Sequence, residues 1–164
     1  MRICIISDSH GKCATITGAI NRLGKIDMIF HLGDLYTDAI YIERTFSLKT
    51  IYVRGNCDFS QETDLHKDVE LVGKKFFLTH GHMYRVKWGI QYLQQAIIGR
   101  NYDIVLFGHT HVPQLFFEQG TLYMNPGSLA DPRAGKKPTI GLIEINHERI
   151  IPYIVNIDDI SKKY

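Results

Sequence analysis

The sequence predicts an α/β fold in which two mixed sheets pack face to face, with helices on the outside. Two observations lead to this prediction. The first third of the chain alternates strand-like and helix-like segments, which is typical of a parallel sheet with right-handed crossovers. The remainder is rich in hairpin patterns. A length of 164 residues is that of one domain, so we expect residues 1–164 to form a single unit with a sizeable core.

Apolar runs and helical spacing place the elements of the first part. We expect strands over residues 2–7, 27–32 and 50–53, and helices over 15–23 and 38–48. In the first helix, Ile16, Ala19, Ile20 and Leu23 recur at helical spacing, and Gly24 is a stop signal.

Hairpins dominate the second part of the pattern. We expect paired strands over 69–72 and 75–79 around Gly73-Lys74, over 114–117 and 121–124, and over 139–145 and 150–155 around Asn146-His147. Between them we expect one helix marked by Val86, Ile90, Leu93 and Ile97, and a buried strand over 102–107. The polar tail from Asn156 is expected to fray.

Composition excludes several classes of protein. The chain is 45% hydrophobic and has a net charge of +2, too small by itself to indicate nucleic acid. It has no apolar run of ~18 residues, so no membrane span is expected. Its three cysteines form neither a disulfide framework nor a Cys-x-x-Cys pair. An odd, scattered set of this kind favours the reducing cytoplasm.

Metal-ligand residue types follow five of the strand-like segments. In α/β sheets, ligands gather beyond the carboxyl ends of the strands, so these side chains are expected to share one crevice. Each has a plainer alternative: a lone Asp after a strand caps a helix, Asn56-Cys57-Asp58 makes a turn, and His80 is a core histidine. Their repeated placement favours a metal centre. The set is Asp8, His10, Asp34, Asn56, His80, His109 and His111.

These blocks resemble the signature of the calcineurin-like metallophosphoesterases. The motifs are Asp8-x-His10, Gly33-Asp34, Gly55-Asn56, His80 in Thr79-His80-Gly81-His82, and Gly108-His109-x-His111. Their order and spacing match over nearly the whole chain. Its short length, the Gly55-to-Asp58 block and Asn125-Pro126-Gly127-Ser128 resemble the small prokaryotic phosphodiesterase branch.

The resemblance implies a four-layer α/β/β/α sandwich that holds two divalent metal ions. By carry-over, Asp8, His10 and His111 bind the first metal, Asn56, His80 and His109 bind the second, and Asp34 bridges both. The implied reaction is phosphodiester hydrolysis, in which a metal-bridging hydroxide attacks phosphorus in line. A nitrogen and oxygen donor set suits Mn, Fe, Co, Ni or Zn, and we favour Mn or Ni. The implied partner is a small phosphate ester, and the sequence leaves a homo-oligomer open.

Cys57 departs from the commoner pattern of that family. Many relatives carry a histidine there, which protonates the leaving oxygen. A thiol with an ordinary pKa of ~8.5 suits this task less well, so diesters with acidic leaving groups are the expected substrates. A small apolar core residue without a role is the alternative for Cys57. His82 is a candidate to protonate the leaving oxygen in place of residue 57; alternatively, it lies outside the metal ligands or on the surface.

Other residues and other functions stay open at this stage. Arg85, Lys87 and the basic run 133–137 are phosphate contacts or solvated surface, and residues 125–128 form a turn with a supporting role near the site. His31 and His147 are interpreted as structural, and His66 as a loop residue without a partner. The alternative functions are a phosphomonoesterase or nuclease of the same fold, and a protein-interaction scaffold with a vestigial site.

Overall fold

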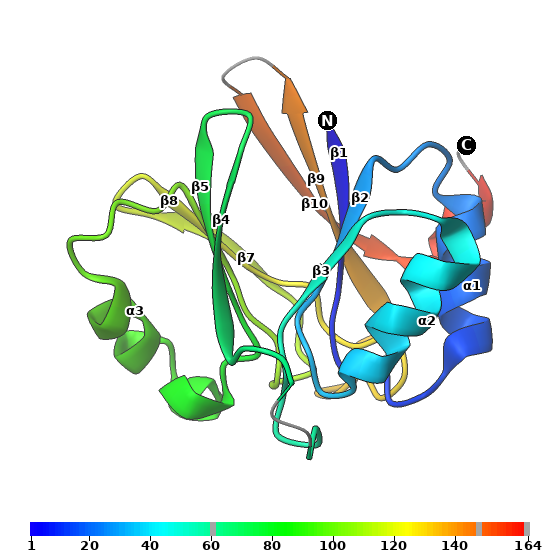
Figure 1. The fold of residues 1–164 in the computed structure, drawn as a ribbon, viewed down its shortest axis with the longest axis horizontal. Helices are drawn as coiled ribbons and strands as arrows, with labels where there is room; N and C mark the ends of the chain where they lie inside the picture. Colours follow the sequence, from blue (N-terminus) through cyan, green and yellow to red (C-terminus); the bar gives the residue numbers. More distant parts are fainter. Residues whose placement is uncertain (60–61, 147–148, 163–164) are drawn as a thin grey trace.

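Two five-stranded mixed sheets face each other in a computed structural model of the chain, which describes residues 1–59, 62–146 and 149–162. One sheet has the order β10-β9-β1-β2-β3 and the other β4-β5-β6-β8-β7. Figure 1 shows α1 and α2 against the outer face of the first sheet and α3 against the outer face of the second. The expected four-layer α/β/β/α sandwich is therefore confirmed.

The first sheet combines the early parallel strands with the last hairpin. β1 (Arg2–Ile6) pairs in parallel with β2 (Met28–His31), which pairs with β3 (Thr50–Tyr52). β9 (Thr139–Asn146) runs antiparallel to β1 and to β10 (Arg149–Asn156). α1 (Cys13–Arg22) and α2 (Tyr36–Phe46) are the two crossovers, as expected for right-handed β-α-β units.

The second sheet is parallel at its centre and antiparallel at its edges. β5 (Lys74–Thr79), β6 (Ile104–Leu106) and β8 (Thr121–Asn125) are parallel neighbours. β4 (His66–Leu71) and β7 (Gln114–Glu118) are antiparallel edges. Three short 3₁₀ helices complete the described chain: η1 (His82–Tyr84), η2 (Val86–Trp88) and η3 (Ile157–Lys162); α3 spans Gln91–Ile97.

The core lies mainly between the two sheets. Ile5 and Phe30 from the first sheet pack with Phe76, Leu78 and Met124 from the second. The rings of Phe30 and Phe76 meet edge-on at 5.5 Å between centroids. Since each sheet is also covered outside by helices, its central strands are buried on both faces, which explains their continuous apolar runs.

Two local expectations were wrong because of backbone conformation. The first hairpin turns at Val72-Gly73, both with positive φ (53° and 69°), so Lys74 already belongs to the strand. Positive φ at both central residues is the requirement of a type I′ hairpin turn. The helix expected from Val86 to Ile97 is interrupted at Gly89, whose φ of 123° no helix accommodates.

Three further expectations concern single segments. His66 was wrongly assigned to a loop: it begins β4, pairs with Thr79, and stacks on Phe77 at 5.4 Å. The tail does not fray at its start, because Ile157 and Ile160 are buried against the core beside α1. His147 lies outside the described residues.

Gly141 offers a direct test of sheet packing. A Cβ added there would lie 2.6 Å from Met124 Sδ and 3.0 Å from Ile5 Cβ, between the two sheets. Gly141→Ala should destabilise the protein by about 1–3 kcal/mol through overpacking, measured by urea unfolding. Gly18→Ala is the matched control, since its methyl meets only Arg22 Nη2 at 3.6 Å inside α1. There the better helix propensity of alanine should raise stability. Equal effects of the two substitutions would contradict this account.

Candidate metal centre

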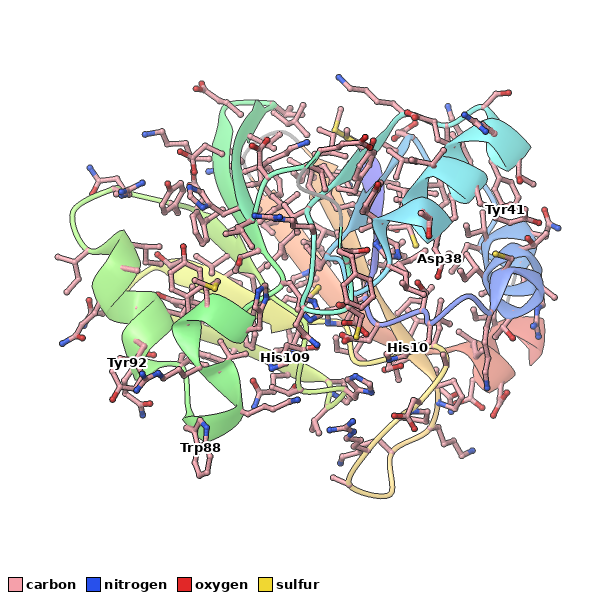
Figure 2. The ribbon with its side chains drawn as sticks, turned by 60° about the horizontal axis from the view of Figure 1, so that its bottom comes forward. His10, Asp38, Tyr41, Trp88, Tyr92 and His109 are labelled. Atoms are coloured by element: carbon pink, nitrogen blue, oxygen red, sulfur yellow. The ribbon has the colours of Figure 1, made fainter. Side chains whose placement is uncertain are left out.

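The five ligand-bearing loops meet at one end of the sandwich, where strands from both sheets end. Asp8 and His10 follow β1, Asp34 follows β2 and Asn56 follows β3; His80 follows β5, and His109 and His111 follow β6. Figure 2 shows His10 and His109 on the same face of the molecule. The structure thus brings together all seven residues that the sequence predicted.

Four of these side chains form a compact group. Donor atoms of Asp8, His10, Asp34 and His111 all lie within 4.8 Å of one another. His111 Nε2 is 3.1 Å from Asp8 Oδ1, and His10 Nδ1 is 3.0 Å from Asp34 Oδ2. The Nε2 atoms of His10 and His111 face each other at 3.4 Å. Two carboxylates and two imidazoles at this spacing are a donor set that suits a divalent transition metal.

The other three side chains form a second group beside it. His80 Nε2 lies 3.0 Å from Asn56 Oδ1 and 3.2 Å from His109 Nδ1. The same nitrogen is 3.7 Å from Asp34 Oδ1. Asp34 therefore lies between the groups, with one carboxylate oxygen toward His10 and the other toward His80.

Hydrogen bonds outside the centre fix which imidazole nitrogens face inward. Nδ1 of His80 lies 2.8 Å from the Leu32 carbonyl, and Nδ1 of His111 lies 2.6 Å from that of Asp131. A carbonyl oxygen only accepts, so both Nδ1 atoms carry the proton. Each Nε2 then presents a lone pair to the centre, which is the tautomer that a metal ligand requires.

The carboxylates also leave atoms that no protein donor satisfies. Oδ1 of Asp8 and Oδ1 of Asp34 are buried, and neither accepts a hydrogen bond from the described part of the chain. Buried polar atoms are rarely left without a partner. Oxygen atoms of this kind, opposite imidazole lone pairs, fit one or more bound cations.

Asp8 is held in a single orientation by its neighbours. Its Oδ2 accepts hydrogen bonds from Ser7 Oγ at 2.6 Å and from the backbone N–H of His109 at 3.0 Å. Burial by itself would raise the pKa of Asp8, but contact with His111, the charge of His80 and the Ser7 bond together lower it to about 2. The group is therefore an anion that directs Oδ1 into the centre.

The imidazoles respond to burial and to one another. Burial, followed by the charges of His80 and Lys87, lowers the pKa of His109 to about 4. For His111, burial would lower the pKa, but close contact with the negatively charged Asp8 carboxylate outweighs burial and raises the value. A neutral His109 is the form that binds a metal.

The backbone of the centre is unusual. Five of the seven residues have positive φ, a conformation rare for residues with a Cβ. Their φ values are 53° for Asp8, 46° for His10, 84° for Asp34, 68° for His109 and 59° for His111. Such conformations cost roughly 1–3 kcal/mol each and persist where the surrounding structure enforces them.

A buried block at the end of β8 supports two of the loops. Asn125 Nδ2 donates to the Gly108 carbonyl at 2.8 Å and contacts Thr110 Oγ1 at 3.0 Å. Ser128 Oγ donates to the Asp8 carbonyl at 2.7 Å. These bonds agree with the supporting role expected for residues 125–128.

Both proton-donor candidates border the centre. The Cys57 thiol faces Asp34, and this interaction, followed by burial, raises its pKa to about 11. The His82 ring lies 5.4 Å from that of His80 and 6.0 Å from that of His109. His82 Nδ1 is buried and makes no hydrogen bond within the described chain, and burial followed by the charge of His80 lowers its pKa.

Sequence reasoning missed the groups that position the ligands. The Leu32 and Asp131 carbonyls are backbone atoms, which carry no sequence signal. Ser7 was included only as the last residue of a strand. His31 was correctly interpreted as structural: it is fully buried, and burial lowers its pKa to about 4.

Among the described residues, no helix is long and apolar enough to cross a membrane.

Comparison with known proteins places the chain among phosphoesterases. Residues 1–148 match the calcineurin-like phosphoesterase superfamily domain. Phosphodiesterase YfcE of Escherichia coli K12 is 34% identical over 170 residues, covering 88% of each protein.

Two solved structures show the same architecture. A predicted phosphoesterase of Streptococcus pneumoniae TIGR4 superposes with a TM-score of 0.81 at 30% identity, over 96% of this chain and 90% of that one. A single mutant of Vps29 from Entamoeba histolytica gives 0.79 at 25% identity, over 94% and 91%.

Gly108 tests whether the orientation of Asp8 matters for the centre. A Cβ there would collide with Ser7 Oγ and lie 3.0 Å from Asp8 Oδ2, although the backbone itself would accept alanine. Gly108→Ala should weaken Mn²⁺ binding by metal-stripped protein at least ~10-fold, as for other groups that orient ligands. Calorimetric titration measures this, with Gly18→Ala as a control that should bind as wild type. Unchanged affinity in Gly108→Ala would contradict the orienting role.

Proposed function

The chain belongs to the calcineurin-like phosphoesterase superfamily, and from this premise we propose that it is a phosphodiesterase with a two-metal centre. Its relatives are named phosphodiesterase and metallophosphoesterase, which supports a metal-dependent hydrolase of phosphoric esters. Two divalent cations at such a centre would supply a hydroxide nucleophile and clamp the attacking and leaving oxygens of an in-line displacement.

One observation carries the proposal: two neighbouring donor groups share Asp34. We assign Asp8, His10 and His111 to the first cation and Asn56, His80 and His109 to the second, with Asp34 between them. In support, Asp34 Oδ2 faces His10 at 3.0 Å and Asp34 Oδ1 faces His80 at 3.7 Å. The donor chemistry favours Mn or Ni, with Fe, Co and Zn as alternatives.

Charge explains the preference for a phosphate ester. The two carboxylates offset only half the charge of two divalent cations, and Asn56 adds a neutral oxygen. A centre of net positive charge attracts the anionic phosphate and stabilises the charge that develops during displacement. We propose that Asp34 and Asn56 act in catalysis by holding this geometry.

Proton transfer to the leaving oxygen is assigned to Cys57 or His82. A thiol with a pKa of about 11 stays protonated at neutral pH but is a weak acid. His82 has an unpartnered buried Nδ1 and is the substitute. In either case help to the leaving group is weak, which favours small diesters with acidic leaving groups over alkyl esters.

Other functions remain alternatives to this proposal. A phosphomonoesterase or nuclease would use the same centre, but a net charge of +2 does not indicate nucleic acid as a partner. A protein-interaction scaffold is the alternative of a different class, and it does not need buried carboxylate oxygens directed at imidazole lone pairs. We further propose a cytoplasmic location, from the unpaired cysteines, and leave a homo-oligomer open.

Metal removal tests the proposed function. Chelation followed by dialysis should abolish hydrolysis of bis(p-nitrophenyl) phosphate, and Mn²⁺ or Ni²⁺ should restore it.

Asp34→Asn should weaken binding of the metal pair and lower kcat at least ~100-fold, since it removes a charged bridge. Full activity in metal-free protein would refute the two-metal reading, and near-normal turnover of Asp34→Asn with two metals bound would refute the bridge.

Cys57→His tests the assignment of the proton donor. An aryl leaving group needs little protonation, whereas an alkoxide needs much. The substitution should therefore raise kcat/KM for diesters with poor leaving groups, within the ~10²–10⁴-fold range of general acid catalysis, and change good ones little. The measurement is kcat/KM against leaving-group pKa for both proteins. Parallel lines would assign the proton to His82 or to solvent, with His82→Gln as the deciding variant.

A further inference from the structure

The first turn of α2 lies between the loop of Asp8 and His10 and the loop of Asn56. Asp38 on this turn lies beside the first loop (Figure 2), and the backbone N–H of Tyr36 contacts Asp58 in the second. Neither Asp38 nor Asp58 belongs to the proposed ligands. Both nevertheless bind backbone groups within a few residues of them.

Asp38 secures the loop after β1. Its side chain is almost fully buried, and its Oδ2 accepts hydrogen bonds from Ser9 Oγ at 2.6 Å and from the Gly11 N–H at 2.9 Å. Residues 9 and 11 flank His10 on both sides. Asp38 therefore holds the chain on both sides of this ligand.

The bond network continues from Ser9 to the loop after β2. His31 Nδ1 lies 3.2 Å from the Gly33 N–H, which can only donate, so Nε2 carries the imidazole proton. His31 Nε2 therefore donates a hydrogen bond to Ser9 Oγ at 2.9 Å, and the Ser9 hydroxyl in turn donates a hydrogen bond to Asp38 Oδ2. The chain from Gly33 to Asp38 has one direction and links the residue before Asp34 to the loop of His10.

Asp58 secures the next loop with its two oxygens. Oδ1 accepts from the Tyr36 N–H at 2.8 Å, and Oδ2 accepts from the Gly55 N–H at 2.7 Å. Tyr36 is the first residue of α2, whose N-cap Leu35 makes no side-chain bond. Asp58 therefore caps α2 and ties it to the residue before Asn56.

The backbone of these loops is strained, and the hydrogen bonds hold it in place. Asp8, His10 and Asp34 all have positive φ, so the loops would relax toward ordinary conformations if nothing held them. A centre that is correctly arranged only part of the time binds its ligand more weakly by that fraction. Groups that enforce the arrangement therefore raise metal affinity without touching the metal.

We propose that Asp38 and Asp58 are positioning residues that divide the centre between them: Asp38 sets the Asp8–His10 half and Asp58 sets the Asn56 half. The division rests on the two-metal function proposed above. It predicts that removing either carboxylate weakens one metal site and spares the other.

Calorimetric titration of metal-stripped protein with Mn²⁺ tests the division, with electron paramagnetic resonance to detect coupled ion pairs. Asp38→Ala should weaken one site ~10–100-fold, and Asp58→Ala the other. His10→Ala identifies the first site. In a His10→Ala background, Asp38→Ala should add little to the loss, whereas Asp58→Ala should still weaken the site that remains.

Conservative variants separate positioning from charge and from folding. In Asp38→Asn, one side-chain oxygen can still accept from Ser9 and Gly11, while the amide nitrogen replaces Oδ1, which lies 3.9 Å from Cys13 Sγ. This variant should therefore retain most of the wild-type affinity for Mn²⁺ at the first site. Asp58→Asn should not, because both Asp58 oxygens accept from backbone N–H groups. If Asp38→Ala does not fold, Ser9→Ala interrupts the same chain more mildly and should weaken the first site.

Asp103→Ala is the matched control. Asp103 directly precedes β6, outside the ligand loops; its Oδ2 accepts from the Lys75 N–H at 2.8 Å and its Oδ1 pairs with Lys74 at 3.3 Å. The substitution should lower stability while leaving both Mn²⁺ affinities unchanged.

Wild-type protein that fails to bind two Mn²⁺ ions would overturn the proposed function. Two wild-type sites that Asp38→Ala and Asp58→Ala leave intact, or weaken alike, would overturn the division alone, as would an Asp38→Asn variant as weak as Asp38→Ala.

Discussion

The left-handed backbone at the strand ends is the constraint on which the rest of this centre depends. A residue of positive φ just after a strand turns the chain sharply. Asp8, Asp34 and His109 all have this conformation, each two or three residues beyond the end of its strand. Because residues with a Cβ resist the conformation, the loops need external support, and much of the polar structure around the centre supplies it.

Close approach of the loops is the second consequence. Gly55 lies against the backbone of Asp34, and Gly108 lies against Ser7, with no room for a Cβ at either position. The glycines that precede Asn56 and His109 are therefore explained by contact between neighbouring strand ends. The same contacts bring donor atoms of different loops within a few ångströms of one another.

The sequence predicted the parts of this protein that have a periodic or repeated signal. Apolar runs located the central strands, and ligand residues after five of them located the centre. The errors arose where conformation depends on a single residue: Gly89 interrupts a helical pattern, and Val72 takes the positive φ of a hairpin turn. His66 looked unpaired because its partner strand lies across a hairpin whose register was not known.

The supporting groups were beyond prediction for a different reason. The Leu32 and Asp131 carbonyls that fix the tautomers of His80 and His111 exist at every residue, so no residue type reveals them. In the sequence Asp38 was only the first residue of an expected helix. Its use by a neighbouring loop follows from the packing of α1 beside α2, which only the folded chain shows.

The centre is also a link between the two sheets. Asp8, His10, Asp34 and Asn56 come from the first sheet, whereas His80, His109 and His111 come from the second. Between the sheets the packing is apolar, but at this end it brings imidazoles together with two buried carboxylates, Asp8 and Asp34, whose Oδ1 atoms accept no hydrogen bond from the described residues. A cation that binds there favours the packed state over any state in which the sheets separate, because only the packed state presents both sets of donors. The apolar core and the polar centre thus depend on the same alignment of the two sheets: the core creates the alignment, and the centre gains its affinity from it.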